Sequence, residues 1–201
     1  MSASGVRLLM VCTGNICRSP MMERLTADAL NHRGVAQWCT VGSAGTWAQP
    51  GEPMQPYAAS TLAERGVAAD GFAATPLGEE LVTSADLILT ATLDHRSAVV
   101  GIAPSAVRRT FTMLELARIA AAAPPQTRQA DLAGPDTVRR SIAWAAQMRG
   151  SIPRALEGAD DLNDPLGAPH DVYRARADAI AGAVGQIVPF LIGPQRGSPA
   201  G

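Results

Sequence analysis

Short apolar runs alternate along the chain with longer stretches of helical periodicity. Residues 6–11 are apolar apart from Arg7 and are bounded by turn residues, a pattern typical of a strand buried on both faces of a parallel sheet. Similar apolar runs predict three further strands, at 38–46, 85–91 and 107–111.

Helices are predicted between these strands from hydrophobic spacing and stop signals, at 21–32, 53–65, 75–84, 93–100, 113–123, 138–149 and 172–192. The last of them is long and amphipathic, with an apolar face made of Ile180, Val184, Ile187, Val188 and Leu191. Two stretches rich in Pro, Gly and small polar residues, 121–137 and 160–171, indicate loops or an insertion.

Strands that alternate with helices predict right-handed crossovers and a parallel sheet covered on both faces. The fold class is therefore α/β, with a four-stranded parallel sheet as the middle of three layers. The 201 residues are enough for one domain, which we assign to 1–194, with an insertion at about 122–150 and a flexible tail at 195–201. Ligands of such sheets bind beyond the carboxyl ends of the strands, and residue 12 stands at the end of the first strand.

Composition narrows the classes of function. Apolar residues make up 47% of the chain and the net charge is −1, which argues against disorder and against nucleic-acid binding. We find no run of 18 apolar residues and no export signal, so we expect a cytoplasmic protein with no membrane partner. The three cysteines, Cys12, Cys17 and Cys39, are an odd number for a disulfide framework. No zinc-binding pattern links them with the scattered histidines, which are His32, His95 and His170.

The stretch "VCTGNICRSP" places a thiol and a guanidinium, Cys12 and Arg18, at the two ends of one tight loop. Gly14 and Asn15 tolerate unusual backbone conformations, which would let successive N–H groups converge on an anion. A helix that starts near Ser19 directs its positive end at the same point, and Arg18 adds a planar fork of donors. This combination predicts a site for a tetrahedral oxyanion.

The same positive field favours the thiolate form of Cys12, and Ser19 could donate a hydrogen bond to that sulfur. A thiolate beneath a bound phosphoryl group is an in-line nucleophile, so the predicted intermediate is a cysteinyl-phosphate. The reaction also needs a proton donor for the leaving oxygen. Four carboxylates in one loop are candidates: Asp160, Asp161, Asp164 and Asp171. We favour Asp164, because Pro165 stiffens the backbone that carries it.

Plainer interpretations exist for each feature taken alone. A cysteine at the end of a buried strand is usually core filler, and an Asp-Pro pair is commonly only a turn. Core filler does not explain why Gly14, Asn15, Arg18, Ser19 and Pro20 occur together.

With these motifs the sequence resembles the low-molecular-weight protein tyrosine phosphatases. The resemblance rests on "VCTGNICRSP", "SAGT" at 43–46, "ADLILT" at 85–90 and "NDPLG" at 163–167. It implies that Cys12 is the nucleophile, Arg18 binds phosphate and stabilises the transition state, and Asp164 is the general acid and base. It also implies that hydrogen bonds from Asn15, Ser19 and Ser43 brace the loop, that the fold is a four-stranded parallel sheet between helices, and that no metal or cofactor is needed.

The resemblance further implies a set of substrate-binding residues: Thr13, Gly14, Asn15, Ile16, Cys17, Ser19 and Trp47. Trp47 would stack on a substrate ring, with a half-buried surface tryptophan as the alternative. Cys17 could form a reversible disulfide with Cys12, or simply pack against the first helix.

Two departures from the family pattern affect the prediction. Leu166 follows Asp-Pro where the family usually has an aromatic residue, so one wall of the substrate slot is expected to be aliphatic. The segment 122–149 is longer than in a typical member, and we hypothesise that it forms a lid or partner surface beside the active site.

The predicted function is hydrolysis of protein phosphotyrosine by a bacterial enzyme. Three alternatives remain: an arginine phosphatase, an arsenate reductase of the same fold, and a catalytically weak module that binds phosphoproteins. Related arginine phosphatases tend to carry threonine where this chain has Ile16, which favours phosphotyrosine. Arsenate reduction needs two further cysteines downstream, and none follows Cys39.

Overall fold

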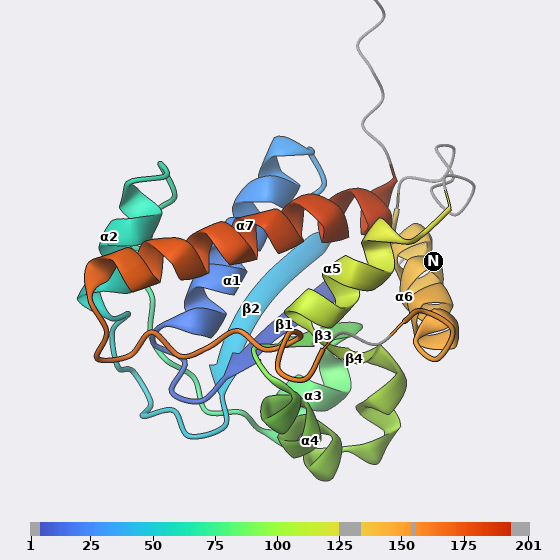
Figure 1. Ribbon diagram of the computed structural model, residues 1–201, viewed down its shortest axis with the longest axis horizontal. Helices are drawn as coiled ribbons and strands as arrows, with labels where there is room; N and C mark the ends of the chain where they lie inside the picture. The colour runs from blue at the N-terminus through green and yellow to red at the C-terminus, as the bar shows by residue number, and fades with distance from the viewer. Residues whose placement is uncertain (1–4, 125–133, 154–155, 194–201) are drawn as a thin grey trace, which may run out of the picture.

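A four-stranded parallel sheet forms the centre of the protein (Figure 1). The structure, a computed structural model, describes residues 5–124, 134–153 and 156–193. The strands lie in the order β2-β1-β3-β4, with bounds β1 Val6–Cys12, β2 Cys39–Gly45, β3 Leu87–Thr90 and β4 Thr110–Thr112. This confirms the predicted fold class. The single domain over 1–194 stays a prediction.

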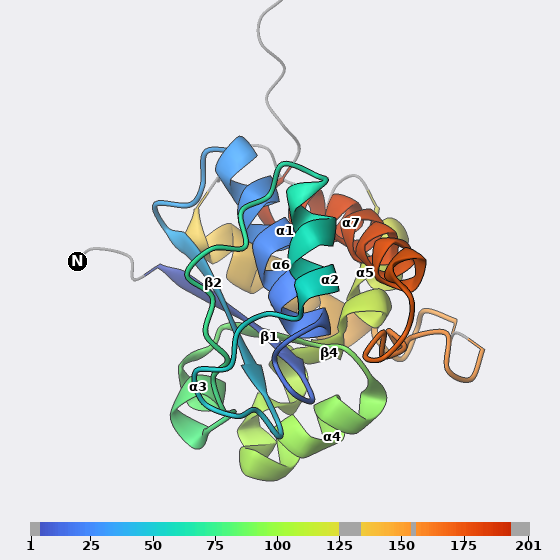
Figure 2. The ribbon, with the colours of Figure 1, turned by 90° about the vertical axis from the view of Figure 1, so that its left-hand side faces the viewer.

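Helices cover both faces of the sheet (Figure 2). The α-helices are α1 Arg18–His32, α2 Pro56–Ala63, α3 Glu79–Ser84, α4 Leu93–Ile102, α5 Met113–Ala121, α6 Pro135–Met148 and α7 His170–Ile192. A 3₁₀ helix, η1, spans Pro104–Arg109. In Figure 2 α3 and α4 lie on one side of the sheet, and α1, α2 and α7 lie on the other.

Strand β1 is buried on both faces, as its apolar run predicts. Val6, Leu8 and Met10 belong to the larger core cluster, which also contains residues of α1, α5 and α7. Leu9 and Val11 belong to a smaller cluster with residues of α3, α4 and η1. Packing on both sides therefore fixes the strand end that carries Cys12.

Several predicted elements begin at another residue in the structure, and prolines bear on two of these differences. The fourth strand was expected at 107–111, but Pro104 opens η1, and the strand starts only at Thr110. The helix expected from residue 75 starts at Glu79, because Pro76 instead forms an isolated bridge with Gly45 at the end of β2. At Pro104 the local proline signal shortens the strand, whereas at Pro76 tertiary pairing overrides that signal.

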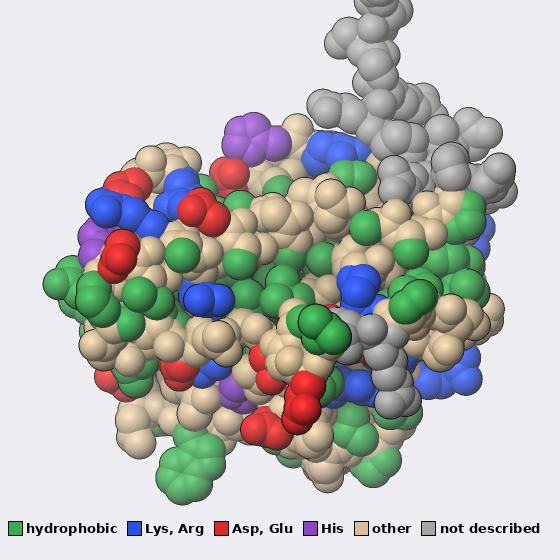
Figure 3. Space-filling view, viewed as in Figure 1, with side chains coloured by type: hydrophobic (Ala, Val, Ile, Leu, Met, Phe, Trp, Pro, Cys, Tyr) green, Lys and Arg blue, Asp and Glu red, His purple; other side chains and the backbone are tan. Residues whose placement is uncertain are grey.

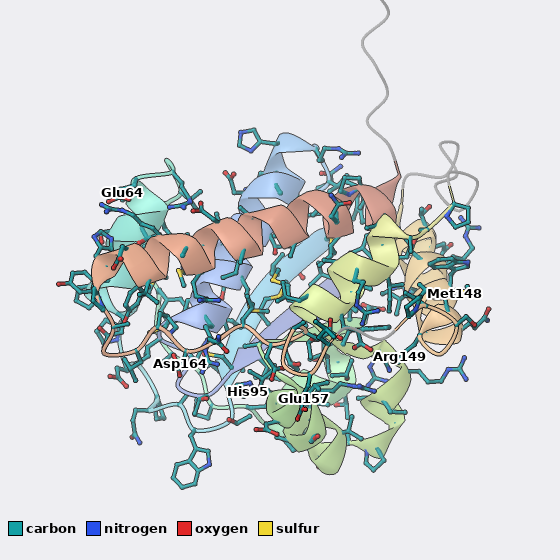
Figure 4. The ribbon with its side chains drawn as sticks, in the orientation of Figure 1. Glu64, His95, Met148, Arg149, Glu157 and Asp164 are labelled. Carbon is teal, nitrogen blue, oxygen red and sulfur yellow. The ribbon has the colours of Figure 1, made fainter. Side chains whose placement is uncertain are left out.

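Helix α6 confirms the helix predicted at 138–149. It packs against α5, α7 and η1 and buries Val138, Ile142 and Ala145. Figure 4 shows Met148, at the end of α6, well apart from Asp164. The lid or partner surface hypothesised for 122–149 stays a prediction, and residues 125–133 of the expected loop and the tail at 195–201 lie outside the described residues.

Helix α7 alone, among the described residues, is long and apolar enough to pass a test for a membrane span. Half of its most apolar window is buried within the protein. The predicted apolar face is buried in full, and the helix packs on α1, α2, α5 and α6. These contacts are those of a core helix. They hold the start of α7 in place, and with it the end of the loop at 160–169.

Gly45 provides a test of how tightly β2 and the loop after β1 are packed. A Cβ on Gly45 would clash with the carbonyl oxygen of Thr13 and lie 2.8 Å from the backbone nitrogen of Asn15. We predict that Gly45→Ala lowers the free energy of unfolding by about 1–3 kcal/mol, measured by urea denaturation. Gly42→Ala on the same strand is the control, because its Cβ meets nothing within 4 Å. Equal stability of the two variants would contradict the prediction.

Candidate functional site

The loop between β1 and α1 is built around Asn15. Its backbone has a φ of 55°, in the left-handed region, and the residue is fully buried. The amide Nδ2 donates to the hydroxyls of Ser19 and Ser43, both at 2.8 Å, and Oδ1 accepts from the backbone N–H of Thr75 at 2.8 Å. Asn15 is thus bonded to three separate segments, which include the two serines named by the resemblance.

The hydrogen bonds around Asn15 continue to Cys12. Ser43 donates its hydroxyl proton to Glu23 Oε2 at 2.5 Å, a carboxylate that sequence reasoning missed. Ser19 Oγ accepts from Asn15 and lies 3.0 Å from Cys12 Sγ. The Ser19 proton can therefore point at the sulfur or at the carbonyl oxygen of Ala44, which lies 3.4 Å from Ser19 Oγ.

Arg18 connects this loop to the loop at 160–169. It is 4% exposed, and its NH2 group lies 2.5 Å from Asp164 Oδ2 and 3.2 Å from Thr13 Oγ1. The NH1 group donates to the carbonyl of Leu162 at 3.2 Å. Its Nε–H is buried and has no hydrogen-bond partner among the described residues. A buried donor left unpaired is costly, so this group suits a bound acceptor.

The structure separates the four candidate carboxylates. Asp160 pairs with Arg118 at 2.7 Å, Asp161 accepts from the backbone N–H of Leu93 at 2.9 Å, and Asp171 is exposed on α7. Asp164 alone of the four contacts Arg18. Its Oδ1 accepts from the N–H of Leu166 at 3.2 Å, which orients the carboxylate within its own turn.

A pocket of about 110 Å³ joins these groups. Its lining residues are Cys12, Thr13, Gly14, Ile16, Cys17, Arg18, Asp164 and Leu166. Leu166 is half exposed at 54%, so the wall that the family usually builds from an aromatic residue is aliphatic here.

Cys17 differs from Cys12 in its surroundings. Its sulfur is buried 3.8 Å from the hydroxyl of Tyr173, and burial raises the pKa of the thiol to about 12. Burial likewise raises the pKa of Cys39, in the core, to about 11. All three cysteines are free thiols. At neutral pH Cys17 is therefore a neutral and weakly reactive thiol, which favours the packing interpretation over the disulfide.

Trp47 does not occupy the expected position. Its backbone N–H donates to Thr13 O at 2.8 Å, but the residue is 82% exposed and is not among the residues that line the pocket. The hydrogen bond to Thr13 holds only the main chain of Trp47, and its side chain lies in solvent. The predicted stacking wall is thus absent from the pocket as described.

His95 is the second residue that sequence reasoning missed. It is 8% exposed on the first turn of α4, with Nε2 2.9 Å from Thr13 Oγ1 and Nδ1 2.7 Å from Thr92 Oγ1. Figure 4 shows it at the same end of the strands as Asp164. Burial and, after it, the charge of Arg18 lower the pKa of the imidazole. His95 follows shortly after the carboxyl end of β3, where ligands of parallel sheets bind. That position in the sequence could have identified it as a candidate site residue.

No group of three or more His, Cys, Asp or Glu side chains among the described residues could hold a metal ion. His170, which the sequence left unassigned, stacks on Tyr57 and lies 3.0 Å from Thr61 Oγ1. On the face in Figure 3 acidic and basic side chains are interspersed without a large patch of one sign. That mixture agrees with a net charge of −1.

Comparison with known proteins gives consistent matches. The model of the family described as low molecular weight phosphotyrosine protein phosphatase matches residues 7–135. A protein-arginine-phosphatase of Bacillus subtilis is 39% identical over 46% of this chain and 59% of its own length. The low molecular weight protein-tyrosine-phosphatase Etp of Escherichia coli is 40% identical over 52% of this chain and 66% of its own length. The aligned part of the chain thus spans less than two thirds of either relative.

A solved structure extends the likeness over most of the chain. The low molecular weight protein tyrosine phosphatase from T. tengcongensis superposes with a TM-score of 0.67 and 26% identity, covering 92% of this chain and 98% of that one. The family model ends at Pro135, so the loop that carries Asp164 lies beyond its match.

The lowered pKa of His95 predicts how stability depends on pH. The imidazole faces Arg18, Asp164, Asp94 and Asp161, and burial keeps it neutral in the folded protein. The unfolded chain binds a proton below its ordinary pKa of 6.5, so the free energy of unfolding should fall as the pH drops below about 6.5 and through the lowered folded pKa. We expect a steeper loss between pH 7 and 5, measured by urea denaturation, in the wild type than in His95→Gln. Parallel curves would rule out this contribution.

Proposed function

The chain belongs to the low molecular weight phosphotyrosine protein phosphatase family, and we propose that it hydrolyses protein phosphotyrosine through a cysteinyl-phosphate intermediate. The observation that carries the proposal is the Arg18–Asp164 ion pair, which brings the nucleophile loop and the acid loop to one pocket beside Cys12. A phosphate-binding loop without an acid would bind esters but turn them over slowly.

In the first step the Cys12 thiolate attacks phosphorus in line with the tyrosyl oxygen. An S–P bond forms, the P–O bond to the tyrosine breaks, and protonated Asp164 gives its proton to the leaving oxygen. Arg18 and the N–H groups of the loop stabilise the charge on the phosphoryl oxygens. The buried Nε–H of Arg18 offers one donor that no described protein group uses.

In the second step a water molecule attacks the phosphorus of the cysteinyl-phosphate. Asp164, now ionised, takes a proton from that water, the S–P bond breaks, and inorganic phosphate leaves with Cys12 restored as thiolate. Hydrogen bonding from Ser19 stabilises the sulfur anion in both steps. The steps proposed here consume only water and use no cofactor.

The rim of the pocket supports an aryl ester as substrate. Ile16 and Leu166 both line it, and they offer apolar surface to a phenyl ring. Dephosphorylation of protein arginine is the second candidate, because one of the relatives is named a protein-arginine-phosphatase. We infer action on phosphoproteins in a bacterial cytoplasm, with no role for nucleic acid or membrane.

Replacement of the nucleophile and the acid tests the mechanism. We predict that Cys12→Ser abolishes hydrolysis of p-nitrophenyl phosphate and of a phosphotyrosine peptide while peptide binding persists. Asp164→Asn should lower kcat by about 10²- to 10⁴-fold, because the leaving group then departs without a proton. Asp171→Asn, at an exposed carboxylate on α7, is the matched control and should leave kcat unchanged.

The alternatives have their own outcomes in the same assays. Phosphopeptide binding by the wild type without turnover would leave only the binding module. Faster hydrolysis of a phosphoarginine peptide than of the phosphotyrosine peptide would transfer the assignment to arginine phosphatase. Arsenate-dependent oxidation of thioredoxin by the pure protein would indicate an arsenate reductase.

The side chain at position 16 tests the choice between the two phosphoamino acids. Ile16→Thr should lower the ratio of kcat/KM for phosphotyrosine over phosphoarginine by up to about tenfold, because a hydroxyl replaces apolar surface beside the ester. Ile16→Val is the control of matching shape without a hydroxyl. If Thr and Val change the ratio equally, polarity at this position does not select the substrate.

A further inference from the structure

Four side chains form a continuous line of polar contacts from the pocket to the start of α4. Arg18 NH2 donates to Thr13 Oγ1 at 3.2 Å, Thr13 Oγ1 lies 2.9 Å from His95 Nε2, and His95 Nδ1 lies 2.7 Å from Thr92 Oγ1. The line crosses from the nucleophile loop to a helix on the opposite face of the sheet. The mechanism proposed above uses only its first member.

The donors along this line have a preferred order. A hydroxyl has one proton to give, and Thr13 Oγ1 already accepts from the cationic Arg18. Its proton is therefore free for His95 Nε2, which must be unprotonated to accept it. The ring proton then lies on Nδ1 and is donated to Thr92 Oγ1. Each group in the line thus donates its proton to the next group farther from Arg18. Hydrogen bonds that run in one direction polarise and strengthen one another.

The ring of His95 is itself held firmly. Thr92 is the N-cap of α4 and also accepts from the backbone N–H of His95 at 3.4 Å. His95 is 8% exposed, so its packed environment leaves the imidazole little freedom. Thr13 is exposed and has no such packing, so His95 is the contact that fixes its hydroxyl.

We propose that His95 is a positioning residue that orients the guanidinium of Arg18 through the hydroxyl of Thr13. The inference rests on the proposed function, since Arg18 is the group that meets the phosphoryl oxygens there. Asp164 and the Thr13 oxygen contact NH2 of Arg18, and the carbonyl of Leu162 contacts NH1, so a fixed Thr13 oxygen is one of three contacts that set the plane of the fork. Such an effect acts on the transition state more than on the bound ester.

Two substitutions at position 95 separate this role from simple packing. The amide of glutamine reaches the place of the imidazole Nε2 and can accept from Thr13. The shorter amide of asparagine takes the place of Nδ1, keeps the contact with Thr92 and loses Thr13. We expect His95→Asn to lower kcat for p-nitrophenyl phosphate about tenfold with KM nearly unchanged, and His95→Gln to restore most of the loss.

A double-mutant cycle tests whether the effect passes through Thr13. Thr13→Val removes the hydroxyl and should cost about as much as His95→Asn, and Thr13→Ser, which returns the hydroxyl, should recover most of that loss relative to Thr13→Val. The combined Thr13→Val/His95→Asn variant should be no slower than either single variant. Losses that multiply in the combined variant, or a glutamine variant as slow as the asparagine variant, would overturn the proposal.

Binding of orthovanadate and inorganic phosphate keeps the test independent of turnover. Vanadate imitates the five-coordinate transition state, so His95→Asn should weaken its binding about tenfold by calorimetry and weaken phosphate binding less. A wild type that binds both anions without hydrolysing any ester would refute the proposed function and leave this inference testable. Equal weakening of both anions, or of neither, would overturn it. Urea denaturation of each variant confirms that it is folded.

Discussion

The left-handed backbone of Asn15 is the constraint on which the site depends. A non-glycine residue in that region costs about 1–3 kcal/mol and persists only where its surroundings hold it. Here the holding contacts are three hydrogen bonds from one amide to Ser19, Ser43 and Thr75. Because Asn15 lies between Cys12 and Arg18, these contacts fix the sulfur and the guanidinium relative to each other. The parallel pairing of β1 with β2 brings Ser43 within reach.

Arg18 unites parts of the chain that are distant in sequence. It begins α1, yet its strongest contact is with Asp164, 146 residues later. The acid loop is also anchored independently of Arg18, since Leu162 donates its N–H to the carbonyl of Ala91 at the end of β3 and Asp161 caps the start of α4. Asp164, Arg18 and Cys12 are therefore all held at the carboxyl ends of two adjacent strands, β1 and β3.

The sequence was sufficient where the information is local. The burial of β1 on both faces follows from its apolar run, and the positions of Cys12 and Arg18 already indicate an anion-binding loop. Asp164 was already favoured among four carboxylates because of Pro165, and the fold adds an independent reason, because Arg118 and the N–H of Leu93 occupy two of the others. Glu23 and His95 were missed since their partners are 20 and 82 residues away. Trp47 was misplaced because a fixed main chain does not fix its side chain.

The acid loop leads directly into α7, so the position of Asp164 depends on the stability of that helix. Tyr173 of α7 reaches Cys17 in the nucleophile loop, and α7 packs along the length of α1, so the last helix and the first share one core. A molecule that loses its C-terminal helix in a partial opening thereby loses its proton donor and one wall of the nucleophile loop together. Opening of the last helix therefore acts on the acid loop and on the nucleophile loop at the same time.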